Sequence, residues 1–244
     1  MSLKINQISK SFDEKHVLGN ITFTVDNGEF ISIIGPSGSG KSTLFGIIGG
    51  IITPNSGDVS TNNQSILNKT GMISYMPQED SLFPWRTVLD NVVLGQELYE
   101  TPNETQAINM LEAAGLKDVI HAFPHELSGG MRQRVSFIRA LMCPQDILCL
   151  DEPFSALDEF TRTDMQKWLL DMWTQYKQSI LFITHNIEEA LFMSDKIIIL
   201  SNSPAEIKEI ITVPFERPRE ESLRLTEEFL SWKKKVIEVI DTLN

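Results

Sequence analysis

The chain has 244 residues, which is enough for one large α/β domain or two small ones. Hydrophobic residues make up 41% and charged residues 22%, as in an ordinary globular protein, and the formal net charge is −12. So acidic a chain argues against a broad nucleic-acid surface, which needs many cations, but a small phosphate site can still be built from backbone N–H groups.

The first part of the chain is typical of short strands that lead into a glycine-rich turn. Residues 3–34 favour strands around turns at Asp13-Glu14 and Asn27-Gly28. Residues 30–34 form a continuous apolar strand that runs straight into Gly35, and a helix is expected from Lys41 to the glycine pair at 49–50. No apolar run approaches the roughly 18 residues of a membrane span, and the N-terminus lacks the apolar block of a signal peptide.

The middle of the chain, about residues 85–143, has a helical pattern. Residues 101–104 (Thr-Pro-Asn-Glu) are interpreted as a capping box with Pro102 at the first helical position. Apolar residues then recur on one face up to Gly115, which is expected to end the helix. The two cysteines, Cys143 and Cys149, have no CxxC partner and no neighbouring His, which indicates neither a metal site nor a redox motif and fits a reducing cytosol.

Continuous apolar strands return in the last hundred residues, at 146–150, 179–184 and 196–200. Helical segments separate them, as expected of a parallel sheet that is covered on both faces. An amphipathic helix is expected from about Thr226, and one face of it carries Phe229, Leu230, Val236, Ile237 and Ile240. We expect this face to pack on the chain's own core.

The glycine-rich turn has the pattern GxxxxGK[ST], and it runs through Gly35, Pro36, Ser37, Gly38, Ser39, Gly40, Lys41, Ser42 and Thr43. Glycines let the backbone curl closely around phosphate oxygens, and successive N–H groups then point inward at the start of a helix. Lys41 can reach the β- and γ-phosphates, and the Ser42 hydroxyl can ligate Mg²⁺. The preceding strand and following helix are the context that this motif requires.

Two carboxylates, Asp151 and Glu152, follow the strand at residues 146–150. Ligands of parallel sheets bind at that end of the strands, and carboxylates there are costly unless a cation or a water uses them. Asp151 would hold Mg²⁺, directly or through water, and Glu152 would polarise the attacking water. Alone, the pair could equally cap the next helix, but the glycine loop favours catalysis.

The segment Leu127-Ser128-Gly129-Gly130-Met131-Arg132-Gln133-Arg134 resembles the signature of ABC-type ATPases. In the order of that family, Phe12 matches the aromatic that stacks on adenine, and Gln78 the glutamine that senses Mg²⁺ and the γ-phosphate. His185 matches the histidine that contacts the γ-phosphate. Asn186 and Phe12 depart from the family's commoner Asp and Tyr, and neither departure puts hydrolysis in doubt.

The resemblance implies an α/β fold: a P-loop NTPase core with a parallel sheet, an N-terminal antiparallel β subdomain and an inserted α-helical subdomain. It places one ABC-type ATPase domain over 1–244, with the core at 1–84 and 144–204, the helical subdomain at 85–143 and a C-terminal extension at 205–244. It also implies ATP and Mg²⁺ as cofactors. In the family, Ser128, Gly129 and Gly130 complete the ATP site of a second copy in a head-to-tail homodimer.

Residues 82–92, the signature and residues 151–158 look like the importer group for nitrate, sulfonate, taurine, bicarbonate and pyrimidine precursors. This resemblance implies permease subunits in the membrane, an extracytoplasmic solute-binding protein, and a cytoplasmic subunit on the inner face of the membrane, with no nucleic acid. A soluble ABC ATPase without a transport role, an exporter ATPase and a non-hydrolysing switch remain alternatives. Between Lys41 and Ser128 the chain is too short for the long coiled coils of DNA-repair members. A non-hydrolysing switch would lack a base such as Glu152.

Overall fold

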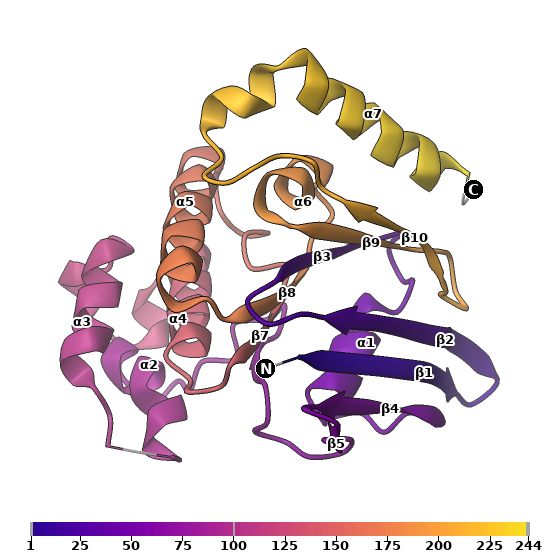
Figure 1. The fold of residues 1–244 in the computed structure, drawn as a ribbon. Coiled ribbons are helices and arrows are strands. Elements are labelled where there is room, and N and C mark those ends of the chain that lie inside the picture. The colour runs from indigo at the N-terminus through magenta and orange to yellow at the C-terminus, as the bar shows by residue number, and fades with distance from the viewer. Residues whose placement is uncertain (1, 100, 243–244) are drawn as a thin grey trace. The chain divides into compact units, whose positions relative to one another are not determined.

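The computed structural model describes residues 2–99 and 101–242. The fold consists of two compact units, one formed by Met1–Met72 with Gln178–Asn244 and the other by Ile73–Lys177. The position of the two units relative to each other is not determined (Figure 1). Each is therefore described by itself.

The first unit contains an antiparallel sheet, as the sequence resemblance implies. Its strand order is β2-β1-β4-β5, with β1 at Leu3–Phe12, β2 at Lys15–Val25, β4 at Ser56–Thr61 and β5 at Gln64–Ser65. Along β1 the side chains of Leu3, Ile5 and Ile8 are buried, and the irregular step between Ile5 and Ile8 reflects a shift in the pairing with β2. One face of this sheet therefore closes over an apolar layer.

A second sheet in the same unit has the order β10-β9-β3-β8, with β10 at Ile207–Thr212, β9 at Lys196–Leu200, β3 at Phe30–Ile34 and β8 at Ser179–Ile183. The strands β9, β3 and β8 are parallel, as their continuous apolar sequences predict. The antiparallel edge strand β10 was not predicted, because it lacks the continuous apolar run of the inner strands: Ile211 is its one buried residue. The helices of this unit are α1 (Lys41–Ile48), α6 (Ile187–Met193) and α7 (Glu227–Asp241), with a short 3₁₀ turn at Glu221–Leu225.

Helix α7 packs on α6 and begins where the sequence indicates, with Thr226 as its N-cap. Phe229 and Val236 are buried and Ile237 and Ile240 are half-buried, which confirms the predicted apolar face in part. The prediction is wrong for Leu230, because its side chain is 47% exposed. It directly follows Phe229 and is rotated from it by about 100° around the helix axis, which turns it away from α6.

The second unit pairs the parallel strands β6 (Ser74–Met76) and β7 (Ile147–Asp151) and contains most of the helical residues. The helices are α2 at Val88–Glu97, α3 at Glu104–Ala113, α4 at Gly129–Leu141 and α5 at Glu159–Tyr176, with 3₁₀ turns at Lys117–Val119 and Pro124–Glu126. Helices α2, α3 and α4 contact one another (Figure 1). The segment between β6 and β7 is therefore helical, as predicted.

The predicted capping box of α3 is wrong by two residues. Asn103 is the N-cap, and its side-chain oxygen accepts the N–H of Gln106 at 3.0 Å. Its own N–H donates to the Gln96 side chain at 2.8 Å. Asn is a better N-cap than Thr, so the helix begins after Asn103, and Pro102 lies outside it.

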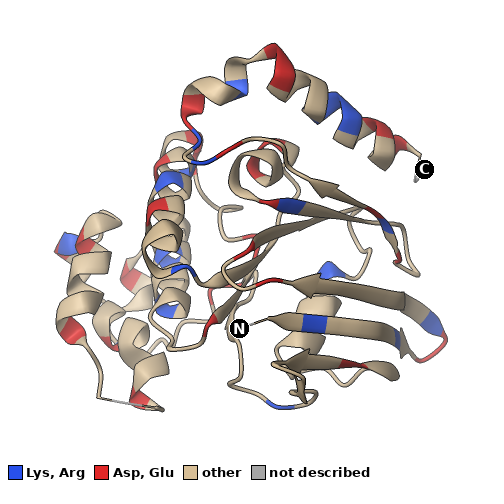
Figure 2. Cartoon of the chain, viewed as in Figure 1, with Lys and Arg blue, Asp and Glu red and all other residues tan. Residues whose placement is uncertain are grey.

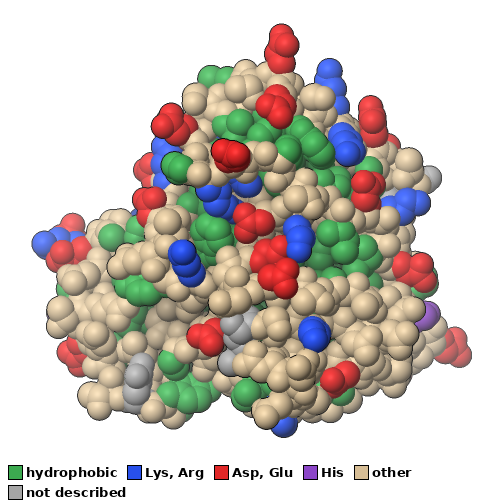
Figure 3. All heavy atoms as spheres, in the orientation of Figure 1, with side chains coloured by type: hydrophobic (Ala, Val, Ile, Leu, Met, Phe, Trp, Pro, Cys, Tyr) green, Lys and Arg blue, Asp and Glu red, His purple; other side chains and the backbone are tan. Residues whose placement is uncertain are grey.

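Acidic and basic side chains are interspersed along the elements of both units (Figure 2). The face drawn in Figure 3 carries charges of both signs, and hydrophobic side chains gather along α7. Among residues 2–99 and 101–242, no helix has both the length and the apolar character needed to cross a bilayer.

Candidate functional site

The glycine loop of the first unit has the conformation that its sequence predicts. Gly40 has a φ of 95°, and a Cβ there would lie 2.8 Å from the side chain of Val17. At Gly35 a Cβ would lie 2.8 Å from the carbonyl oxygen of Leu200. Both positions therefore require glycine. At Gly40 the positive φ and the close contact both disfavour a side chain, and at Gly35 the close contact alone does so.

Lys41 folds back over this loop instead of extending into solvent. It is buried, and its Nζ donates to the carbonyl oxygens of Gly35 at 3.0 Å and Pro36 at 2.9 Å. Gly40 is the N-cap of α1 and supplies no side-chain hydrogen bond to the first turn. Ser37, Gly38 and Ser42 are exposed. The loop thus combines an exposed helix N-terminus with a buried cation held beside it, a combination that suits an anion.

His185 lies at the end of the neighbouring parallel strand, in register with the glycine loop. Ile33 of β3 pairs with Ile183 of β8, so Gly35 and His185 each come two residues after a paired position. The His185 side chain is exposed. The fold of the first unit therefore brings the predicted phosphate loop and the predicted γ-phosphate contact to one edge of the same sheet.

The second unit repeats this relationship with different residues. Met76 of β6 pairs with Leu150 of β7, so Gln78 and Glu152 each come two residues after a paired position. Their side chains meet, with Gln78 Nε2 donating to Glu152 Oε2 at 3.1 Å. Asp151 is buried at the end of β7. Burial of the Tyr75 hydroxyl, together with the negative charge of Asp151, raises the pKa of that hydroxyl.

The backbone of Glu152 is held in an unusual conformation by Gln133 of α4. Glu152 has a φ of 50°, which is uncommon for a residue with a side chain. The buried Gln133 amide donates to the carbonyl oxygen of Glu152 at 3.1 Å and accepts the N–H of Ala156 at 2.9 Å. Sequence reasoning missed Gln133, although it lies inside the quoted signature, because nothing in a polar helix residue indicates that it faces inward.

The start of α4 carries the signature residues Ser128, Gly129 and Gly130. Ser128 is the N-cap, and its hydroxyl accepts the N–H of Met131 at 3.3 Å. Ser128 and Gly129 are exposed. Because this turn carries no acidic residue, its open N–H groups suit an anion brought by another molecule.

Two arginines of α4 hold the loop that follows Gln78. Arg132 donates to the Asp80 carboxylate at 2.8 Å, and Arg139 donates to the carbonyl oxygens of Asp80 and Ser81, each at 2.9 Å. Burial lowers the pKa of Arg139. The loop after Gln78 and the helix that carries the signature are therefore one hydrogen-bonded assembly.

The same loop exposes a pair of stacked aromatic rings, those of Phe83 and Trp85. The ring centroids lie 5.1 Å apart with an interplanar angle of 10°, and Trp85 is 71% exposed. Buried Asn91 of α2 shapes the loop by bonding the Phe83 N–H at 2.8 Å and the carbonyl oxygens of Phe83 and Arg86 at 3.1 Å each. A large apolar ring in a loop indicates either a core residue or a partner contact, and the exposed ring of Trp85 excludes a place in the core of this unit.

The predicted adenine contact, Phe12, ends β1 in the first unit. Its ring is 44% exposed, and the Lys10 ammonium lies 4.7 Å from its centroid. An exposed ring at a strand end can stack on a planar base. The first unit thus carries Phe12, the glycine loop with Thr43 and His185, and the second carries Gln78, the signature, Asp151 and Glu152.

Comparison with known proteins identifies relatives over most of the chain. A family model described as ABC transporter matches residues 18–155. The aliphatic sulfonates import ATP-binding protein SsuB of Bacillus cereus is 37% identical over 98% of this chain and 95% of its own length. The nitrate import ATP-binding protein NrtD of Synechococcus elongatus is 40% identical over 82% of this chain and 76% of its own length. A dimeric ATP-binding cassette solved in a post-hydrolysis state with ADP and Pi superimposes with a TM-score of 0.78 at 28% identity, covering 88% of this chain and all of the other.

Proposed function

This chain belongs to the ABC transporter family as an ATP-hydrolysing subunit, and we propose that it powers the import of a small anion or organic solute. Nitrate, sulfonates, taurine, bicarbonate and pyrimidine precursors are the candidate solutes. Support comes from relatives named as import proteins for sulfonates and nitrate and from one named as a bicarbonate transport protein. The transported solute would not touch this subunit, so the partner chains would determine which solute is carried.

The observation that carries the proposed mechanism is the paired register at the strand ends. Gly35 and His185 occupy equivalent positions on β3 and β8, and Gln78 and Glu152 do so on β6 and β7. In our proposal the loop N–H groups and Lys41 bind the phosphates, and His185 contacts the γ-phosphate. Glu152 accepts a proton from the attacking water, and Gln78 orients its carboxylate.

The residues present fit an Mg²⁺ ion bound together with the nucleotide. Ser42 offers a hydroxyl, Gln78 an amide oxygen and Asp151 a carboxylate, and hard oxygen donors suit this ion. Among the described residues no group of three or more His, Cys, Asp and Glu gathers as a cage. A nucleotide-borne Mg²⁺ needs only one or two protein ligands besides phosphate oxygens, and its charge would neutralise the oxygens that become more negative during transfer.

We also propose that two copies form a head-to-tail dimer in which Ser128, Gly129 and Gly130 of one copy contact the γ-phosphate bound by the other. The open first turn of α4 and the dimeric state of the solved relative support this arrangement. A site completed by a second copy also explains why an anion-binding helix start carries no acidic residue of its own.

The permease would dock on the stacked rings of Phe83 and Trp85. An exposed aromatic pair suits the apolar face of a partner helix, and Arg132 and Arg139 connect its loop to the signature helix. This contact would place the subunit on the cytoplasmic face of the membrane, with a solute-binding protein on the opposite side.

Co-expression with candidate permease chains tests the proposal. The expected result is a complex whose ATP hydrolysis in proteoliposomes rises when the solute-binding protein and the correct anion are added outside. Export of solute from the vesicle side that bears this subunit would overturn the import assignment. Hydrolysis that no membrane chain alters would overturn the transport assignment.

A further inference from the structure

The turn between β8 and α6 fixes both neighbours of His185 to the first turn of α6. Before it, the Thr184 hydroxyl donates to the buried Glu189 carboxylate at 2.5 Å and accepts the N–H of Asn186 at 3.0 Å. After it, the Asn186 side chain accepts the N–H groups of Glu188 at 2.9 Å and Glu189 at 3.3 Å. A displacement of α6 would therefore move the backbone that carries the imidazole.

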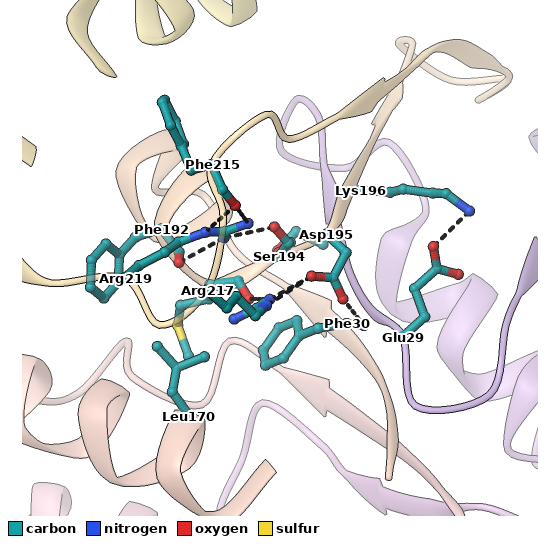
Figure 4. Close-up of polar contacts among 12 residues, drawn as sticks. Glu29, Phe30, Leu170, Phe192, Ser194, Asp195, Lys196, Phe215, Arg217 and Arg219 are labelled. Atoms are coloured by element: carbon teal, nitrogen blue, oxygen red, sulfur yellow. Dashed lines mark hydrogen bonds and ion pairs between the residues drawn. The ribbon is translucent and has the colours of Figure 1, made fainter. Parts of the chain in front are cut away.

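The other end of α6 is held by Arg217 and Arg219, which we name the arginine brace. The last carbonyl groups of a helix have no partner within it, and cations are favoured there. Arg217 donates to the carbonyl oxygen of Met193 at 2.5 Å. Arg219 donates to three others, those of Leu191 at 3.2 Å, Phe192 at 2.9 Å and Ser194 at 2.8 Å. Figure 4 shows the brace at this helix end.

The guanidinium of Arg219 binds carbonyl oxygens of two different segments. Besides the carbonyls at the end of α6, it donates to the Phe215 carbonyl oxygen through Nε at 3.0 Å and through Nη2 at 2.8 Å. Burial lowers its pKa to about 10, which leaves the side chain charged at neutral pH. A lysine could supply the charge, but its single nitrogen could not span these acceptors.

The brace is also connected to β3, the strand that leads into the glycine loop. Arg217 Nε donates to the Asp195 carboxylate at 2.9 Å, and the same carboxylate accepts the N–H of Phe30 at 2.9 Å. The hydroxyl groups of Ser194 and Ser32 are also hydrogen-bonded. The end of α6 is therefore fixed to the strand that places the phosphate loop.

Helix α7 covers this arrangement. The ring of Phe229 stacks on Phe215, the residue whose carbonyl Arg219 binds, with centroids 5.6 Å apart. Lys233 of α7 pairs with Glu188 in the first turn of α6 at 2.6 Å. Both ends of α6 are thus in contact with the segment that follows β10.

We propose that Arg219, supported by Arg217, is a positioning residue for His185: it fixes α6 against β3 and so sets where the imidazole lies relative to the glycine loop. The inference rests on the role of His185 in the proposed function. It assigns a purpose in ATP hydrolysis to the C-terminal segment.

The test is substitution Arg219→Gln, with Arg219→Lys as the conservative variant and Lys235→Gln as the control. Lys235 is an exposed cation on α7 that lies over the Trp232 ring. We expect Arg219→Gln to lower kcat roughly 10- to 100-fold with KM for ATP within about twofold, because small misplacements of a catalytic group cost rate rather than binding. Arg219→Lys should lose less, and Lys235→Gln should match the wild type.

A readout independent of turnover is the NMR spectrum of ¹³C-labelled histidines, of which the chain has four. Arg219→Gln should shift the His185 ring resonance and leave those of His16, His121 and His125 in place. If Arg219→Gln does not fold, the same shift and the same fall in kcat are expected, in smaller measure, for Arg219→Lys. An unmoved His185 resonance, with kcat per folded molecule at the wild-type level, would overturn the inference. Unchanged hydrolysis in His185→Ala would instead overturn the role proposed for His185, while the NMR result would still decide whether the brace positions it.

Discussion

The side-chain amide of Gln78 donates to the carboxylate of Glu152 at 3.1 Å, across the ends of two parallel strands. Gln78 also begins the loop that Arg132 and Arg139 tie to the signature helix. The carboxylate proposed as the general base is thus in direct contact with the segment that leads to the exposed Phe83–Trp85 pair. A change at either end of this connection has a physical route to the other.

Glu152→Gln should keep ATP binding and lose turnover. The amide has nearly the same shape as the carboxylate but cannot accept a proton, and general base catalysis contributes about 10²- to 10⁴-fold. We expect a fall in kcat of that order with unchanged nucleotide affinity, measured by phosphate release and by equilibrium binding of a labelled nucleotide. Steady hydrolysis within a few-fold of wild type would show that another group takes the proton.

Gln133→Leu should weaken both the fold of the second unit and its hydrolysis. The change removes hydrogen bonds to Glu152 and Ala156, and leaving such buried groups unpaired costs about 1–3 kcal/mol. Urea unfolding measures the loss of stability, and turnover per folded molecule measures the misplacement of Glu152. The matched control is Gln64→Leu on the exposed strand β5, which should alter neither. Full activity per folded molecule would mean that Glu152 keeps its conformation without Gln133.

Much of this fold could be predicted from sequence because its signals are local. The strands β3, β7 and β8 are continuous apolar runs, and the glycines at 35 and 40 are required by close contacts that no other residue permits. The strands β6 and β10 could not be predicted in the same way. β6 has three residues, and β10 lies at a sheet edge where the apolar pattern is weak.

The residues that hold the site in place were harder to identify than the residues that form it. Gln133 and Arg219 act through backbone groups far away in sequence, and Asn91 acts through those of the preceding loop. Their side chains belong to types that usually face solvent, and only the folded chain reveals their partners. The exposure of Trp85 could not be predicted for a related reason, since a large apolar ring in a loop indicates either a core or a partner and the sequence contains no signal that separates the two.

Lys41→Ala should weaken ATP binding itself. Lys41 is the cation held over the glycine loop. Without it, the backbone N–H groups of the loop would have to stabilise the phosphate charge by themselves. We expect at least a tenfold rise in Kd, since a charge-assisted hydrogen bond contributes about 1.5–3 kcal/mol. Titration with a fluorescent nucleotide provides the measurement, and thermal unfolding of the ligand-free variant controls for folding. An unchanged Kd would count against the assigned role.

Mixing two inactive variants should restore part of the activity if the site is shared between copies. Ser128→Arg blocks the start of α4, and Lys41→Ala disables the glycine loop, so each variant alone has no intact site. A mixed head-to-tail dimer holds one site with both halves intact. We expect the mixture to hydrolyse ATP above the sum of the separate variants, with a rate that depends on protein concentration. Strict additivity, with activity independent of concentration in the wild type, would contradict a shared site.

Trp85→Ala, and to a smaller extent Phe83→Ala, should weaken assembly with the permease and leave the isolated subunit intact. The Trp85 ring is 71% exposed and stacks on the neighbouring Phe83, so its loss should cost the free chain little stability. Buried aromatic anchors at an interface commonly contribute 2 kcal/mol or more, so affinity for the partner should fall at least about 30-fold. Pull-down of the permease, ATP binding and thermal unfolding are measured on the same preparations, with Tyr176→Ala as a control because Tyr176 is exposed at the end of α5. Loss of partner binding with an unchanged unfolding temperature supports docking at this pair. A parallel loss of stability would place the rings in the core of the free chain, and no loss of either would place the docking surface elsewhere.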